Sequence, residues 1–106
     1  METPTPICDA EQCTTMAQVR AGVDAVDRAL IALLARRFAY MEAAARIKPE
    51  RALVRDEARK AQVLANVRAE AAGQGVPEAV VAVLWEALVE ASIAYEFAAF
   101  DRRRPA

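Results

Sequence analysis

The chain has 106 residues, enough for one domain with a modest core. Apolar residues make up 56% of it and only three residues are glycine, a composition that favours helices. No stretch alternates apolar and polar residues as a half-buried strand does. The net charge of −1 gives no attraction to nucleic acid or acidic membranes, and the absence of histidine removes the commonest general base and metal ligand.

Residues 1–14 contain Pro4 and Pro6 and are predicted to be an irregular N-terminal segment. Cys8 and Cys13 are the only thiols, and we expect them to stay free in a reducing compartment. The segment has no apolar core of signal-peptide length, and no run in the chain reaches membrane-spanning length. These features predict a cytoplasmic protein.

A long amphipathic helix is predicted next, from a cap at Thr14 or Thr15 to Arg46 or Ile47, where Pro49 stops it. Its apolar positions recur every three or four residues and form one seam. Arg37 interrupts this seam, where a charge is costly unless an anion meets it. The seam positions are Val19, Val23, Val26, Leu30, Leu33, Arg37, Tyr40, Ala44 and Ile47.

This helix is too long for its own chain to cover. About 32 residues at 1.5 Å each make a helix of about 48 Å. A compact chain of this size has a radius of gyration of only about 13 Å. The simplest cover for the remaining apolar seam is a second copy related by a two-fold axis, which predicts an intertwined helical homodimer.

A loop over 49–55 leads to a second helix over 56–72, with Asp56 as its N-cap. Gly73 and Gly75 then break the chain.

The third helix is predicted to have Pro77 in its first turn and to continue past Phe100 to Arg104. One stripe of this helix places Ser92 and Glu96 beside apolar neighbours. Its members are Trp85, Val89, Ser92, Glu96 and Ala99. The fold class is therefore all-α, a three-helix chain with one long N-terminal helix.

Several cations accompany Arg37. Lys48 lies three helical turns beyond it near the same face, Arg59 opens the second helix, and Arg20 of a partner chain could reach the far end of an antiparallel pair. Each one alone could lay its stem on the core and lift its charge to water. Together they would repel one another without a shared anion, and guanidinium groups fit carboxylates. The pattern predicts a small organic dicarboxylate bound between helices, handled by positioning and electrostatic stabilisation.

The sequence resembles the all-helical chorismate mutase family over residues 14–100. The matching spacing is Arg-x6-Asp-x9-Arg-x10-Lys followed by Val-Arg-Asp. The residues that carry it are Val19-Arg20, Ala25-Val26-Asp27, Leu30-Ile31-Ala32-Leu33-Leu34-Ala35-Arg36-Arg37, Lys48, Val54-Arg55-Asp56, Arg59 and Glu90-Ala91-Ser92-Ile93-Ala94-Tyr95-Glu96.

This resemblance implies a chorismate mutase-like domain over 15–104, an entwined dimer, and the cofactor-free, metal-free Claisen rearrangement of chorismate to prephenate in the shikimate pathway. It implies that Lys48 donates to the ether oxygen whose bond breaks. The implied binding set for the two substrate carboxylates is Arg37, Lys48 and Arg59, with Arg20 entering from the partner chain and with Asp56 and Ser92 lining the site.

Two positions depart from the family pattern. Bacterial members often have glutamine at the position of Glu96, and a glutamate can donate a hydrogen bond only when protonated. We therefore expect activity to rise as pH falls. Many mutases of this type have a glutamate for the substrate hydroxyl where this chain has Lys60, so this hydroxyl is expected to be recognised differently. The simpler alternative is that Lys60 points to solvent and a backbone group or water binds the hydroxyl.

Other functions stay open. Arg36-Arg37-x-x-Tyr40 and Lys48 are also similar to isochorismate-pyruvate lyases, whereas Val54-Arg55-Asp56 favours the mutase. The Lys60 change leaves a 4-amino analogue of chorismate as a possible substrate. A non-catalytic helical dimer that binds a carboxylate metabolite or a protein is the alternative outside enzymes. The run Arg102-Arg103-Arg104 is better explained by the helix dipole than by nucleic-acid binding.

Overall fold

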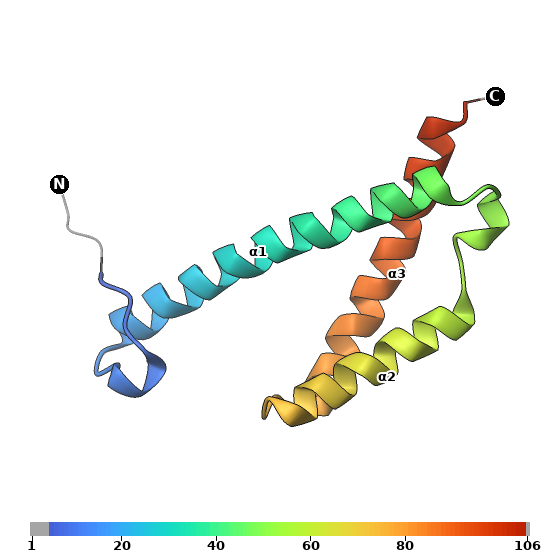
Figure 1. The fold of residues 1–106 in the computed structure, drawn as a ribbon. Coiled ribbons are helices and arrows are strands. Elements are labelled where there is room, and N and C mark those ends of the chain that lie inside the picture. The colour runs from blue at the N-terminus through green and yellow to red at the C-terminus, as the bar shows by residue number, and fades with distance from the viewer. Residues whose placement is uncertain (1–4, 106) are drawn as a thin grey trace. The chain divides into compact units, whose positions relative to one another are not determined.

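The computed structural model describes residues 5–105, and all regular structure in that part of the chain is helical (Figure 1). The predicted three-helix, all-α chain is confirmed. The long helices are α1 (Met16–Ile47), α2 (Glu57–Gly73) and α3 (Glu78–Arg103), with short 3-10 turns η1 (Ala10–Gln12) and η2 (Arg51–Leu53).

The start of α1 is set by a reciprocal cap, which selects Thr15 over Thr14 as the capping residue. The Thr15 hydroxyl accepts a hydrogen bond from the Gln18 amide at 3.2 Å, and the Gln18 side chain accepts one from the Thr15 amide at 3.1 Å. This pattern satisfies backbone donors that the first turn of a helix leaves without partners. The helix ends at Ile47, two residues before Pro49, as predicted.

The two segments predicted to lack structure each contain a 3-10 turn. In the N-terminal segment, η1 is closed by the Cys13 amide, which donates to the Ala10 carbonyl at 3.2 Å. The loop over 49–55 contains η2. The sequence did not predict these turns because a single three-residue turn has no apolar periodicity to reveal it. Pro4 lies outside the described residues.

The connection between α2 and α3 follows the glycine signal, with one correction. The Asp56 side chain caps α2 by accepting from the Arg59 amide at 3.0 Å, as predicted. Gly75 adopts a φ of 71°, a conformation that glycine accommodates without steric cost, and it ends α2 in a Schellman-type turn. Pro77 precedes α3 as its N-cap and does not lie inside the first turn.

The chain forms two compact units, one up to Arg37 and one from Phe38 onward. In the second unit, α2 runs beside α3, and the last turns of α1 meet the C-terminal half of α3 (Figure 1). The core there is small. Its buried members are Ala45, Val54, Ala99 and Phe100, and Ile93, Tyr95 and Phe97 pack against them.

The helix α1 has two apolar faces, one covered by the chain and one exposed to solvent. In the second unit the chain covers the face that carries Ala45, which is completely buried, and the half-buried Phe38 and Met41. The predicted seam is a different face, and its apolar members stay open to solvent. The exposed seam residues are Val19, Val23, Val26, Leu30, Leu33, Tyr40 and Ile47.

Candidate functional site

The polar stripe predicted on α3 is a buried face of that helix. Val89, Ser92, Glu96 and Ala99 are all buried, and Trp85 is half-buried. Glu96 and Ser92 are the buried polar residues of the described chain. The period of the sequence was enough to identify this face because α3 is regular throughout.

The buried carboxylate of Glu96 is paired with Lys48. The Lys48 Nζ lies 2.7 Å from Glu96 Oε2, which joins the residue just past α1 to the C-terminal half of α3. The Glu96 side chain is 6% exposed and the Lys48 side chain 29% exposed. A carboxylate taken out of water requires such a partner. The pair therefore places a cation at a largely enclosed position with one side still accessible.

Ser92 lies one turn before Glu96 on the same face of α3. Its hydroxyl donates to the Leu88 carbonyl at 2.7 Å, four residues back along the helix. This local bond is usual for a serine inside a helix and fixes the rotamer of the side chain. The structure thus brings Ser92, Glu96 and Lys48 into one region of the second unit.

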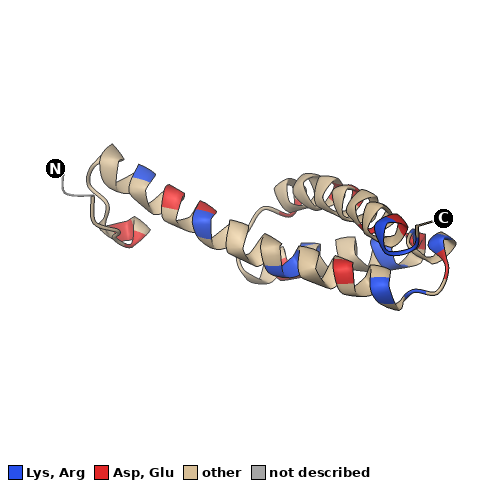
Figure 2. Cartoon of the chain, turned by 90° about the horizontal axis from the view of Figure 1, so that it is seen from above, with Lys and Arg blue, Asp and Glu red and all other residues tan. Residues whose placement is uncertain are grey.

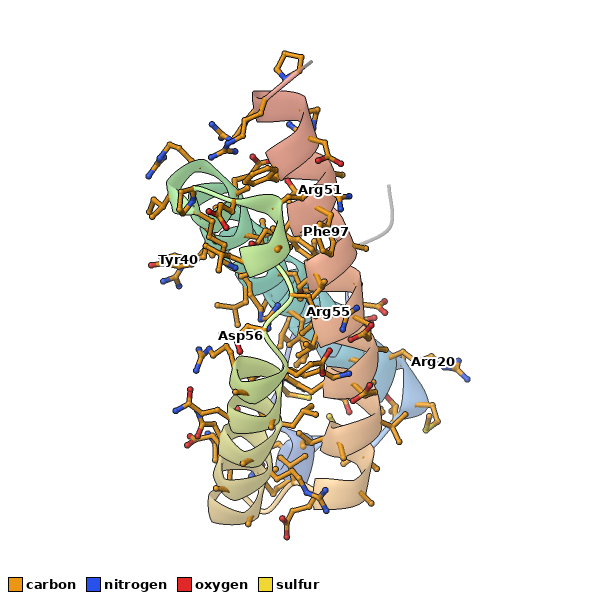
Figure 3. All side chains as sticks on the ribbon, turned by 90° about the vertical axis from the view of Figure 1, so that its right-hand side faces the viewer. Arg20, Tyr40, Arg51, Arg55, Asp56 and Phe97 are labelled. Carbon is orange, nitrogen blue, oxygen red and sulfur yellow. The ribbon has the colours of Figure 1, made fainter. Side chains whose placement is uncertain are left out.

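Asp56 and Arg59 lie at the start of α2, and both are exposed. The carboxylate of Asp56 accepts from the Arg59 amide, so its structural role is a helix cap (Figure 3). The Arg59 guanidinium donates to Gln62 Oε1 at 2.7 Å along the same helix. Their predicted contacts with a substrate stay predictions.

Lys60 does not point to solvent, which excludes the simpler of the two alternatives for this position. Its side chain is 16% exposed, and its Nζ lies 2.6 Å from Glu86 Oε1 and 2.9 Å from Glu90 Oε2. Arg55 binds Glu90 through two guanidinium nitrogens, at 2.8 and 3.1 Å, and also binds Glu57 (Figure 3). The bonds to Glu86 and Glu90 reach α3 from Lys60 on α2 and from Arg55 just before it, so proximity along the chain could not reveal them.

The network around Glu90 has clear electrostatic consequences. The hydrogen bonds from Arg55, and then those from Lys60, lower the pKa of Glu90 to about 2. The hydrogen bonds to Glu86 and Glu90 raise the pKa of Lys60. Sequence reasoning missed Glu86 and Glu90, although their spacing of four residues on α3 places them on one face.

The terminal arginines find partners in α1. Arg102 and Arg103 lie 2.9 and 3.2 Å from the Glu42 carboxylate, and the Tyr95 hydroxyl donates to the same carboxylate at 2.9 Å. The bond from Arg102, followed by that from Tyr95, lowers the pKa of Glu42 to about 2. Figure 2 shows basic residues gathered where the end of α3 meets the end of α1. The arginine run therefore joins two helices, beyond any effect on the dipole of its own helix.

Arg20 and Arg37 belong to the first unit, both on α1. Arg20 is exposed and Arg37 is half-buried. Their participation in the site stays a prediction.

Within residues 5–105, no group of three or more cysteine, aspartate or glutamate side chains is arranged to hold a metal ion. No helix in the same range is long and apolar enough to cross a membrane.

Residues 19–97 match the family described as chorismate mutase type II. This range covers most of the chain and includes every predicted site residue from Arg20 to Glu96, so the protein belongs to that family. A search of curated proteins gave no match.

Proposed function

We propose that this protein is a chorismate mutase that rearranges chorismate to prephenate without a cofactor, through a domain over 15–104. The observation that carries the proposal is the contact between Lys48 and Glu96, which holds an ammonium group on a buried helical face inside the family match. A reaction that needs only a positioned donor is suited to such a group.

The rearrangement is intramolecular. One C–O ether bond breaks while a C–C bond forms, and no atom enters or leaves. Negative charge grows on the ether oxygen as its bond to carbon lengthens, so a donor fixed at that oxygen stabilises the transition state more than the ground state. In this proposal Lys48 is that donor, and Glu96 holds it in place before the substrate binds.

The remaining cations bind the two substrate carboxylates. Arg37 and Arg59 suit this role because a guanidinium group can bind a carboxylate with two parallel hydrogen bonds. Asp56 and Ser92 line the same site, and Arg20 reaches it from a partner chain. Glu96 as a carboxylate can only accept hydrogen bonds, so its own donation to the ether oxygen requires a proton.

The proposed assembly is a homodimer in which the two α1 seams pack together. Its support is the exposure of the seam valines and leucines, on a face distinct from the one the chain itself covers at Ala45. We also place the protein in the cytoplasm, where free thiols such as those of Cys8 and Cys13 persist.

The decisive experiment supplies purified protein separately with chorismate, isochorismate and 4-amino-4-deoxychorismate and identifies the products. We expect prephenate from chorismate. Salicylate plus pyruvate from isochorismate alone would establish a lyase instead, and preferential turnover of the amino analogue would change the assigned substrate. Dicarboxylate binding without turnover would identify a non-catalytic binding protein.

A mixing experiment tests whether Arg20 crosses to the partner. Arg20→Ala and Lys48→Ala should each be inactive as pure dimers. After subunit exchange, half of the dimers contain both variants, and one of their two sites keeps both wild-type residues. Activity should therefore return to about a quarter of the wild-type value. If Arg20 served its own chain's site, mixing would restore nothing.

A further inference from the structure

The end of α1 has a hydrogen-bonding problem that its own sequence creates. The Lys48 amide donates to the Ala44 carbonyl at 2.9 Å, which continues the helical pattern. The next carbonyl, that of Ala45, would accept from residue 49, but Pro49 has no amide hydrogen. Because Ala45 is completely buried, its carbonyl needs another donor.

Arg104, just past the end of α3, supplies that donor. Its Nη1 donates to the Ala45 carbonyl at 2.9 Å, and its Nη2 donates to the carbonyls of Arg46 at 3.3 Å and Lys48 at 2.8 Å. The guanidinium carbon lies 3.8 Å from the centre of the Phe100 ring, which is itself part of the buried core. A planar group with several donors can bridge these carbonyls in a way that one ammonium group cannot.

We propose that Arg104 is the positioning residue for Lys48, an inference that rests on the proposed role of Lys48 in the reaction. The main chain of Lys48 lies beyond the last residue of α1, where helical bonding is ending. Arg104 fixes this main chain by its 2.8 Å bond to the Lys48 carbonyl, while Glu96 fixes the other end of the side chain. The positive charge of Arg104 at the C-terminal end of α1 also interacts favourably with the dipole of that helix.

Arg104 itself lies outside what the family match covers, since the matched range ends at residue 97. Without Arg104, the main chain of Lys48 could rotate and carry the ammonium group away from Glu96. A displacement of about 1 Å can lower a rate about 10²-fold. Arg104 therefore acts through Lys48 and not by touching the substrate.

The test compares Arg104→Ala and Arg104→Lys with Arg103→Ala. The last is a matched control because Arg103 binds Glu42 at 3.2 Å one residue earlier in the chain. We expect Arg104→Ala to lower kcat at least about tenfold while the fold is retained. Arg104→Lys should recover little, and added guanidinium ion should restore part of the activity of Arg104→Ala but none of that of Lys48→Ala. Arg103→Ala should keep kcat within about twofold.

Hydrogen exchange at the Lys48 amide separates this inference from the proposed function. Exchange there should become faster in Arg104→Ala than in Arg103→Ala, whether or not the protein is a mutase. Unchanged exchange together with wild-type kcat would overturn the positioning role. Equal loss of activity in both variants would also overturn it, because the effect would then belong to the helix end in general. Faster exchange in a protein that lacks mutase activity would reject only the proposed function.

A second, independent observation concerns the two cysteines of the first unit. The Sγ atoms of Cys8 and Cys13 lie 3.2 Å apart across η1. Both residues line an apolar cavity of about 530 Å³ whose wall includes Val19 and Val23 of the exposed seam. A disulfide needs the sulfur atoms about 2.05 Å apart, a small movement from this arrangement.

We infer that Cys8 and Cys13 are a site of reversible oxidation by hydroperoxides. One thiolate attacks the peroxide, forms a sulfenic acid and releases water or an alcohol. The second thiol then displaces the hydroxyl group, which leaves as water when the S–S bond forms. The two electrons lost by the thiols reduce the peroxide. The disulfide then links the two sides of η1 beside Val19 and Val23.

Mass spectrometry after hydrogen peroxide treatment tests this inference. The wild type should lose about 2 Da and both titratable thiols, and dithiothreitol should restore them. Cys8→Ser and Cys13→Ser should give a sulfenic acid or a crosslink between chains. Persistence of both thiols in the wild type, or formation only of crosslinks between chains, would overturn the inference.

Discussion

The two units of this chain use their side chains in opposite ways. The unit up to Arg37 leaves its apolar seam exposed, and Val26 in that seam is 59% exposed to solvent. The unit from Phe38 onward encloses charge, and the carboxylate of Glu96 is nearly inaccessible beneath Lys48. Burying exposed apolar surface by association lowers the free energy, whereas an enclosed charge is stable only beside fixed polar partners. In the proposed function, the exposed seam serves assembly and the enclosed pair of Lys48 and Glu96 serves the chemistry.

The largest effect should come from removing the enclosed cation. Lys48→Ala takes away the proposed donor to the ether oxygen and should lower kcat about 10²–10³-fold without changing the oligomeric state. Steady-state kinetics and analytical ultracentrifugation measure the two properties. Arg51→Ala is the control, because it removes a cation from the exposed pair with Asp101. Near-normal kcat in Lys48→Ala would break the assignment of chemistry to the second unit.

A charge on the seam should act on assembly. Val26→Glu puts a carboxylate into the proposed interface. We therefore expect the dissociation constant of the dimer to rise at least about tenfold and the activity to fall with it. Val83→Glu on α3 is a matched control, since Val83 is even more exposed at 71%. Sedimentation across a range of protein concentrations distinguishes the variants. Equal behaviour of the two would contradict a dimer built on the seam.

Protonation of Glu96 should change kcat with pH, by less than the two substitutions above. Only a protonated carboxyl can donate to the ether oxygen, so kcat of the wild type should be higher at acid pH than at neutral pH. Glu96→Gln donates at every pH, so its profile should be flatter. Identical profiles for the two proteins would remove Glu96 from the reaction and leave Lys48 as the only donor of the pair.

The smallest effect should be on acid stability. The pKa of Glu90 is lowered from about 4.5 to about 2, so its ionised form stabilises the fold fully above about pH 4.5, and this contribution is lost as pH falls toward 2. Glu90→Gln should lower the unfolding temperature at pH 7 by a few degrees and reduce its decline between about pH 5 and 3. Glu78→Gln, at a 4.0 Å contact with Arg68, is the control and should retain the wild-type decline.

Local chemistry made much of the fold predictable from sequence. The capping side chains at Thr15 and Asp56 and the stop before Pro49 act within one turn of the residues they affect. The buried stripe of α3 followed from its period alone. Arg37 could be singled out because it interrupts an apolar seam, and its role in binding stays a prediction. The 3-10 turns could not, since they are too short to carry a pattern.

The sequence by itself determined the helices, the caps of the first two and the exposed seam. Only the tertiary structure decided which charged residues are paired and with which partners. Lys48 meets a carboxylate 48 residues away, Lys60 turns to α3 instead of solvent, and Arg104 binds main-chain carbonyls 56 to 59 residues before it. Helical periodicity fixes which way a side chain faces, but packing between helices fixes what it meets.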